Sequence, residues 1–245
     1  MDRDTLSQIA HTRHRIAAPV AVAEVRELLS WLSPPTGGRV LDLGCGWGAW
    51  LVELLRRRQD LTAVGVDLAL PSAVGGGAGD GIAERVTWVQ ADAATYAADP
   101  VDAVLCIGAS HAFGGLSQTL DAVRRHLRPG GQVLLGDAIW DRPPSTAAQE
   151  ALDAAADEFA DLAGFVAQVQ AHGFEPGYGH VSTLQEWDDY EWSWTASLTR
   201  WALREAPTPT EREAALAAAR EHRDAWLNGY RGQLGFVTVV LDDVS

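Results

Sequence analysis

The stretch Val40-Leu41-Asp42-Leu43-Gly44-Cys45-Gly46-Trp47-Gly48-Ala49-Trp50 is an apolar run that gives way to three closely spaced glycines and then resumes with helical periodicity. This pattern predicts a buried strand, a tight loop and the start of a helix. The glycines can adopt backbone angles closed to other residues, and without Cβ atoms they let a ligand lie against the main chain. We therefore expect the loop to bind a flat ligand.

Two classes of ligand fit this glycine spacing. Residues 44–49 satisfy the G-x-G-x-x-G/A fingerprint of dinucleotide-binding proteins, and Asp67 follows at about the distance expected for an acid that binds a ribose. Asp42, however, would place a carboxylate beside a loop that should cradle a pyrophosphate, and a negative charge there suits a cationic ligand better. The spacing alone leaves an NAD-dependent oxidoreductase open as an alternative.

The segment VLDLGCGWG, an acid followed by G-x-G-x-G after a hydrophobic strand, resembles the first motif of the class I S-adenosylmethionine-dependent methyltransferases. The resemblance continues through GASHAFGG, LRPGG, residues 187–191 and the terminal YRGQLGFVTVVL, and it is closest in character to a bacterial subgroup that acts on small molecules. It implies that Asp42 and the glycine loop face the methionine part of the cofactor, that Asp67 accepts from both ribose hydroxyls and that Asp92 meets the adenine amine. The cofactor-binding residues implied in this way are Asp42, Gly44, Cys45, Gly46, Asp67, Leu68, Asp92, Ala93, Ile107 and Gly108.

The composition restricts the partners of the protein. A chain of 245 residues that is 47% apolar and 21% charged is typical of one α/β domain. Its net charge of −14 argues against a nucleic-acid partner, because phosphate backbones are held chiefly by clusters of basic residues. All nineteen basic residues are Arg, and without Lys the Schiff-base and P-loop chemistries are excluded. With no leader and no apolar run of membrane length, we expect a cytoplasmic protein without a membrane partner.

Neither a disulfide nor a metal site is expected. Cys45 and Cys106 lie in apolar contexts at strand ends rather than in metal-type pairs. His11 and His14 lack the further ligands that a metal would need, and we expect the polar segment around them to be a solvated surface, although such a segment can also fold over a cofactor. Trp47 and Trp50 either narrow the mouth of the glycine loop or pack.

Strands and helices alternate along the first part of the chain. We expect helices at residues 19–32, 50–58 and 116–127, strands at 63–67, 86–90, 103–107 and 132–135, a Gly-rich loop at 75–81 and a turn at 128–131. This alternation predicts an α/β fold with a doubly wound, mostly parallel sheet. Ligands bind beyond the carboxyl ends of such strands, which is where Asp42, Asp67, Asp92 and Gly108 fall.

The second part of the chain is less regular. Residues 145–171 are expected to be mostly helical, with strands at 179–182 and 235–241. The resemblance implies that these two strands complete a seven-stranded Rossmann-like sheet, with strand seven antiparallel and residues 184–230 as a helical insertion between them. Thr208-Pro209-Thr210-Glu211 predicts a capping box and a first-turn proline for the second helix of the insertion. The whole chain is then one domain, with an N-terminal helical segment (1–36), a cofactor-binding half (37–141) and a substrate half (142–245).

Methyl transfer from S-adenosylmethionine requires few catalytic groups. The donor is already activated, so the protein chiefly aligns the acceptor atom and excludes water. A base is needed only where the acceptor must lose a proton. His111, directly after the fourth strand, is a candidate because histidine changes charge near neutral pH, but it can equally be a bystander that bonds a neighbouring loop. Asp137, after the fifth strand, can either help or be structural.

Aromatic residues at helical spacing are more often core than pocket, so most of those in the insertion are expected to pack. The resemblance nevertheless implies an acceptor site after the fourth strand and in the insertion, and the acceptor-binding residues expected on this basis are Ser110, His111, Phe113, Trp140, Trp187, Tyr190 and Trp194. The sequence thus predicts transfer of a methyl group from S-adenosylmethionine to an O, N or C atom of a small metabolite, by a monomer or homodimer. The all-Arg composition hints at a GC-rich genome and specialised metabolism. A cofactor-binding protein without methyl-transfer activity is a further alternative.

Overall fold

The computed structural model describes residues 1–71, 74–75 and 81–244, so the predicted Gly-rich loop at 75–81 falls mostly outside the described residues. The chain divides into two compact units. The unit that we name the sheet unit comprises Ala21–Ala138, Leu162–Val181 and Phe236–Ser245. The helical unit comprises Met1–Val20, Ile139–Asp161 and Ser182–Gly235.

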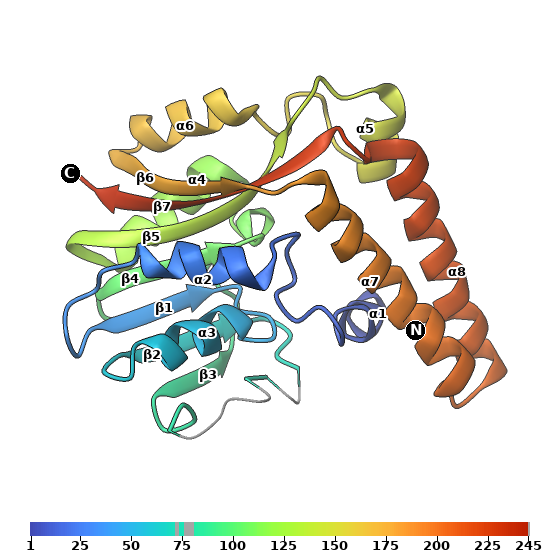
Figure 1. The fold of residues 1–245 in the computed structure, drawn as a ribbon, viewed down its shortest axis with the longest axis horizontal. Coiled ribbons are helices and arrows are strands. Elements are labelled where there is room, and N and C mark those ends of the chain that lie inside the picture. The colour runs from blue at the N-terminus through green and yellow to red at the C-terminus, as the bar shows by residue number, and fades with distance from the viewer. Residues whose placement is uncertain (72–73, 76–80, 245) are drawn as a thin grey trace. The chain divides into compact units, whose positions relative to one another are not determined.

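Seven strands form one sheet in the order β3-β2-β1-β4-β5-β7-β6 (Figure 1). Their bounds are β1 (Arg39–Leu43), β2 (Thr62–Asp67), β3 (Val86–Gln90), β4 (Val101–Ile107), β5 (Leu127–Trp140), β6 (Phe174–Val181) and β7 (Leu234–Asp243). Within the first five strands every pair of neighbours is parallel, whereas β6 is antiparallel to β7. The predicted doubly wound, mostly parallel sheet is confirmed.

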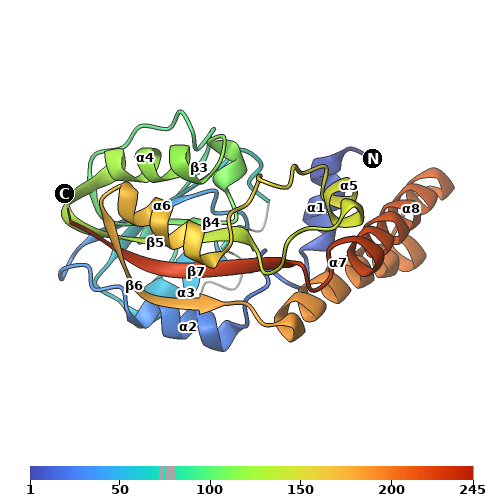
Figure 2. The ribbon, with the colours of Figure 1, turned by 90° about the horizontal axis from the view of Figure 1, so that it is seen from above.

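Helices cover both faces of this sheet. Figure 2 shows α2 (Val22–Ser30) and α3 (Ala49–Arg57) on one face, and α4 (Leu116–His126) and α6 (Leu162–Ala171) on the other. Each helix turns an apolar stripe to the sheet; in α3 that stripe includes Trp50, which is 4% exposed. Trp50 is therefore a packing residue, which decides between the two roles left open for it.

The glycine loop connects β1 to α3 as predicted. Gly44, Gly46 and Gly48 have φ values of +82°, +50° and +71°, a region that other residues rarely adopt. At Gly44 the space is closed as well, because an added Cβ would lie 2.4 Å from the Cβ of Ala109 in the loop after β4. The loops after β1 and β4 are thus pressed together at the edge of the sheet where a ligand is expected.

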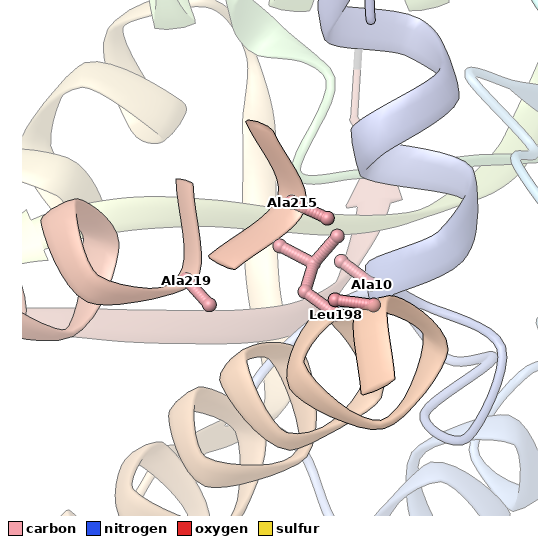
Figure 3. Packing of buried hydrophobic residues seen from close by; sticks show 5 residues of the cluster. Ala10, Leu198, Ala215 and Ala219 are labelled. Atoms are coloured by element: carbon pink, nitrogen blue, oxygen red, sulfur yellow. The ribbon is translucent and has the colours of Figure 1, made fainter. Parts of the chain in front are cut away.

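The helical unit contains α1 (Arg3–Ala10), α5 (Thr146–Leu152), α7 (Leu184–Arg204), α8 (Pro209–Ala225) and a π-helical turn at Trp226–Tyr230. The predicted helical insertion is confirmed. α1, α7 and α8 meet at a core in which Leu198 is surrounded by alanines (Figure 3); its buried members are Ala10, Leu198, Ala202, Ala215 and Ala219. Small side chains at these positions let the three helices approach one another closely. No helix in the described part of the chain is long and apolar enough to cross a membrane.

At the start of α8 the predicted first-turn proline is confirmed, but the predicted capping box forms only in part. There the Thr208 hydroxyl accepts from the Glu211 N–H at 3.2 Å and donates to the Glu211 carboxylate at 2.6 Å. In a capping box the carboxylate would instead accept from the backbone N–H of Thr208. The reciprocal capping box is found at the start of α7, between Thr183 and Glu186.

Three element boundaries also differ. The predicted turn at 128–131 lies inside β5, where the register against β4 shifts between Val101 and Ala103. Residues 145–171 form two separate helices, because Asp153 adopts φ +50° and ends α5. β6 begins at Phe174, earlier than expected, since its pairing with β7 extends to Asp243.

Substituting Gly44 by alanine tests the closed loop. We expect Gly37→Ala to cost about 1 kcal/mol, because Gly37 has φ +73° but nothing within 4 Å of an added Cβ. Gly44→Ala should cost about 1–3 kcal/mol more, because it adds a clash with Ala109 to the same backbone strain. Urea unfolding measures both values. Equal losses in the two variants would show that the two loops are not in close contact.

Candidate active site

Backbone hydrogen bonds tie the glycine loop to the end of β2. The N–H groups of Gly44 and Cys45 donate to the Val66 carbonyl at 2.9 and 3.0 Å. The Gly48 N–H donates back to the Cys45 carbonyl at 2.8 Å, which closes the turn before α3. The loop is therefore held in one conformation by its own main chain.

Asp67, at the end of β2, completes this connection. Its carboxylate accepts from the Gly46 N–H at 2.8 Å and from the Ala69 N–H at 3.0 Å. A carboxylate has about four lone-pair sites, so about two remain for a ligand. The bond to Gly46 fixes the direction of the Asp67 carboxylate and the shape of the loop together.

Asp42 is a buried acid without a full set of partners. It lies in β1, is 2% exposed, and its Oδ2 atom receives no hydrogen bond from the described residues. Burial raises the pKa of the Asp42 carboxyl to about 8, and the negative charge of Asp67 adds to the increase. Because an uncompensated buried carboxylate is costly, a cationic group that donates hydrogen bonds would be favoured beside it.

The remaining predicted cofactor residues also belong to the sheet unit. Leu68 follows β2 and is 70% exposed, an unusual degree for a leucine. Asp92 is exposed after β3 and accepts from the Ala94 N–H at 2.9 Å, while Ala93 beside it is buried. Ile107 ends β4 and Gly108 follows it. All of them lie at or just beyond the carboxyl ends of parallel strands.

The predicted acceptor residues Ser110 and His111 lie in a short 3₁₀-helix after β4, and His111 is exposed. The Ser110 hydroxyl donates to Oδ1 of Asp137 at 2.7 Å, and the Ala138 N–H donates to the same oxygen at 2.9 Å. Asp137 is 6% exposed, and burial raises the pKa of its carboxyl. The two hydrogen bonds and the charge of His111 oppose that increase. The structure thus joins Ser110 and Asp137, while Phe113 is half-buried.

The thiol groups of the two cysteines are chemically inert. Burial raises the pKa of the Cys45 and Cys106 thiols far above the ordinary value, so both stay protonated and unreactive. Among the residues that the structure describes, no group of three or more His, Cys, Asp and Glu side chains is placed to hold a metal ion.

In the helical unit, His11 and Tyr190 form a hydrogen bond of defined polarity. His11 Nδ1 lies 2.8 Å from the Ser7 carbonyl oxygen, and Nε2 lies 3.0 Å from the Tyr190 hydroxyl. Since a carbonyl only accepts, the hydrogen-bond pattern assigns the proton to Nδ1 of neutral His11, and Nε2 accepts from Tyr190. Burial lowers the pKa of His11, which favours the neutral form. The tyrosine oxygen keeps only its acceptor capacity for other groups.

His14 also contacts Tyr190, edge-on at 5.3 Å between ring centres. His11 and His14 are both half-buried, and burial lowers the pKa of His14 as well. The expectation that this segment is a solvated surface is therefore wrong for the two histidines. The error arose because their partner is far along the chain, on α7.

A buried glutamate next to Tyr190 was missed from the sequence. Glu191 is 1% exposed; Tyr230 donates to its Oε1 at 2.8 Å, and His222 Nε2 lies 2.6 Å from its Oε2. Trp194 stacks on the His222 ring with centres 3.8 Å apart. The available signal was the spacing of Glu191, which shares the apolar face of α7 with Leu198.

The predicted acceptor tryptophans are mostly engaged in packing. Trp140 is 5% exposed and contacts Phe159 at 5.3 Å between ring centres. Trp187 packs edge-on against Tyr190 and Tyr230, at 6.2 and 6.4 Å. The structure thus brings Trp187 and Tyr190 together, whereas Trp194 pairs with His222 and Trp140 with Phe159.

A cavity of about 730 Å³ lies at the amino-terminal halves of β1 and β2 and the start of β3, and none of these site residues lines it. The connection between β3 and β4, residues 91–100, contains no helix that would cover this face. The cavity is thus a consequence of the short connection and lies away from the carboxyl ends of the strands.

Known proteins resemble this chain along most of its length. Residues 9–186 match the protein family described as "Methyltransferase domain". YjhP from Escherichia coli is 30% identical over 207 residues, which are 82% of this chain and 83% of YjhP. The crystal structure of a SAM-dependent methyltransferase from Geobacter sulfurreducens in complex with S-adenosyl-L-homocysteine is similar with a TM-score of 0.86, at 27% identity and 98% coverage of both chains. A corresponding enzyme from Thiobacillus denitrificans, also in complex with S-adenosyl-L-homocysteine, has a TM-score of 0.82 at 28% identity, with 98% of both chains covered.

The pKa of Asp42 makes stability depend on pH. Between its ordinary pKa of about 4 and its raised value of about 8, the folded protein holds a proton that the unfolded chain has lost. The Asp42 contribution therefore lowers the free energy of unfolding as pH rises, by up to about 1.4 kcal/mol per unit. Relative to wild type, Asp42→Asn should gain stability steadily from pH 5 to pH 8, measured by urea unfolding without ligand. The same substitution at exposed Asp92 provides the control, and a constant difference across this range for Asp42→Asn would refute the assignment.

Proposed function

This chain belongs to the S-adenosylmethionine-dependent methyltransferase family, and we propose that it transfers the methyl group of this cofactor to an O, N or C atom of a small metabolite. The observation that carries the proposal is the buried carboxyl of Asp42 below the glycine loop, with an oxygen that no described residue satisfies. The ammonium group of the cofactor's methionine part fits such a carboxyl, because a bound cation stabilises its charged form, whereas a pyrophosphate would leave that buried charge uncompensated. The NAD-dependent alternative is therefore not retained.

When bound, S-adenosylmethionine supplies a methyl group that its sulfonium charge has already activated. We infer that Asp42 binds the ammonium group, and that the main chain of Gly44, Cys45 and Gly46 lies against the rest of the methionine part. The two free acceptor sites of Asp67 suit the ribose hydroxyls, because its other sites are used by backbone N–H groups.

The adenine is assigned to the neighbouring strand ends. Leu68, 70% exposed, offers it an apolar contact, and a flat ring covering this side chain would remove it from water. The Asp92 carboxylate would accept from the adenine amine beside Ala93. Ile107 and Gly108 would lie along the other side of the cofactor.

We propose that Ser110, His111 and Phe113, in the segment after Gly108, bind the acceptor. The bond from Ser110 to Asp137 holds this segment in place, and His111 is exposed, so it can pass a proton to water. His111 is the candidate general base for an acceptor that must lose a proton.

In the helical unit, Trp140, Trp187, Tyr190 and Trp194 remain predicted acceptor contacts. Tyr190 has the strongest support, because its oxygen can accept a hydrogen bond while its own proton is engaged by His11. The packing of Trp140 and Trp194 against other rings favours a supporting role for them.

We also infer the setting of the enzyme from its composition. A net charge of −14 supports a small-molecule acceptor without a nucleic-acid partner. We propose a cytoplasmic bacterial enzyme of specialised metabolism, acting as a monomer or homodimer and without a membrane partner. Detection of a methylated product from a metabolite panel distinguishes this function from a protein that only binds the cofactor.

Removing the Asp67 carboxylate should weaken cofactor binding. Asp67→Ala is expected to cost about 1.5–3 kcal/mol of binding free energy, the range for hydrogen bonds to a charged group. Calorimetry with S-adenosylhomocysteine measures the loss, and urea unfolding shows whether the glycine loop, which loses the acceptor of its Gly46 N–H, is destabilised as well. Unchanged affinity would remove Asp67 from the ribose site.

Replacing His111 by glutamine tests the base. Turnover should fall by roughly 10²- to 10⁴-fold while the affinity for S-adenosylhomocysteine hardly changes. A variant that keeps its turnover would make His111 a bystander.

A further inference from the structure

Asp42, Asp67 and Asp92 lie at or just beyond the carboxyl ends of parallel strands, and a fourth aspartate, Asp137, lies within β5 directly after Gly136, where the pairing with β4 ends. Among the described residues, the hydrogen bonds that reach their carboxylates come from backbone N–H groups and one serine hydroxyl, and none comes from an arginine. The proposed function gives cofactor roles to the first three. Asp137 is left without one.

Asp137 has the properties of a ligand-binding carboxylate. It is 6% exposed, and both of its hydrogen bonds, from Ser110 and from the Ala138 N–H, reach Oδ1. No described residue donates a hydrogen bond to Oδ2. Burial raises the pKa of the Asp137 carboxyl despite these two bonds. The hydrogen-bond partners of this carboxylate are neutral, and the charge of exposed His111 compensates it only in part, so a bound cation would complete the compensation.

Asp137 also lies next to the proposed cofactor residues. The preceding residue, Gly136, pairs with Ile107 across the sheet and accepts from the Gly108 N–H at 2.8 Å. A Cβ at Gly136 would lie 2.7 Å from the Ile107 side chain, so the two strand ends are tightly packed. Asp137 is thus fixed beside Gly108 and bonded to Ser110, which follows Gly108 closely in the chain.

Building on the proposed function, we propose that the methyl acceptor is an amine and that Oδ2 of Asp137 binds its nitrogen. The amine is an ammonium ion in water and pairs with the carboxylate on binding. One N–H proton leaves to His111 and from there to water. The nitrogen lone pair then forms the N–C bond while the C–S bond breaks and its electrons remain on sulfur. The product is a methylated ammonium ion, which Asp137 stabilises.

An amine fits this carboxylate better than an oxygen or carbon acceptor does. Positive charge develops on an attacking amine nitrogen, and a fixed carboxylate beside it stabilises that charge without reorganisation. An alcohol that loses its proton would instead bring negative charge towards Asp137. The net charge of −14 also attracts cationic acceptors from solution.

The test compares amines with matched alcohols. Benzylamine and benzyl alcohol, and cyclohexylamine and cyclohexanol, are titrated by calorimetry into the full-length protein saturated with S-adenosylhomocysteine. Each amine should bind more tightly than its alcohol in wild type. Asp137→Asn should weaken amine binding about 10- to 100-fold and leave alcohol binding unchanged. Ser110→Ala, which keeps the charge but removes one donor to Oδ1, should have a smaller effect of the same sign.

Asp99→Asn is the matched control, because it removes the same charge from a side chain that is 88% exposed at the other end of the sheet. It should leave amine binding unchanged. Asp137→Asn conserves shape and removes a costly buried carboxyl, so urea unfolding should show an intact fold. The proposal is overturned if no amine binds, if amines and alcohols bind equally, or if Asp137→Asn binds amines like wild type. Failure of wild type to bind S-adenosylhomocysteine would instead refute the proposed function.

Discussion

The hydrogen bond from the Gly46 N–H to the Asp67 carboxylate is the constraint on which the site depends. It joins the loop after β1 to the end of β2 at 2.8 Å, and it requires the positive φ that glycine provides. The same loop lies against Ala109 after β4, at a distance that is possible only because Gly44 has no side chain. The ends of three neighbouring strands, β1, β2 and β4, are thereby fixed relative to one another, and the carboxylates of Asp42 and Asp67 lie on this common edge.

That edge is electrostatically unfavourable in the absence of a ligand. Asp42 and Asp137 are both buried, and burial raises the pKa of each carboxyl. Raised pKa values of this kind are frequent at functional sites, because a site that must bind positive charge retains acids which the folded protein alone does not compensate. A sulfonium cofactor with an ammonium group would supply the missing charge at one end of the site, and an amine acceptor would supply it at the other.

In the helical unit, Glu191 and His11 are hydrogen-bonded among aromatic rings. Glu191 is satisfied on both oxygens by Tyr230 and His222, and His11 is satisfied on both ring nitrogens. Such complete networks hold side chains in one arrangement, whereas a half-satisfied network would be costly. The alanine-rich core around Leu198 brings α1 close to α7, and this contact sets His11 against Tyr190.

The sequence by itself determined the fold class, the glycine loop and the strand ends at which Asp42, Asp67 and Asp92 lie. These follow from periodicity and from the backbone freedom of glycine, which act over a few residues. Only the tertiary structure decided that Trp50 packs, that Asp137 bonds Ser110 and that Glu191 is buried between His222 and Tyr230. The solvated surface expected at His11 became a contact with Tyr190, 179 residues away. Burial and hydrogen-bond partners of this kind depend on packing between distant segments, which no local pattern records.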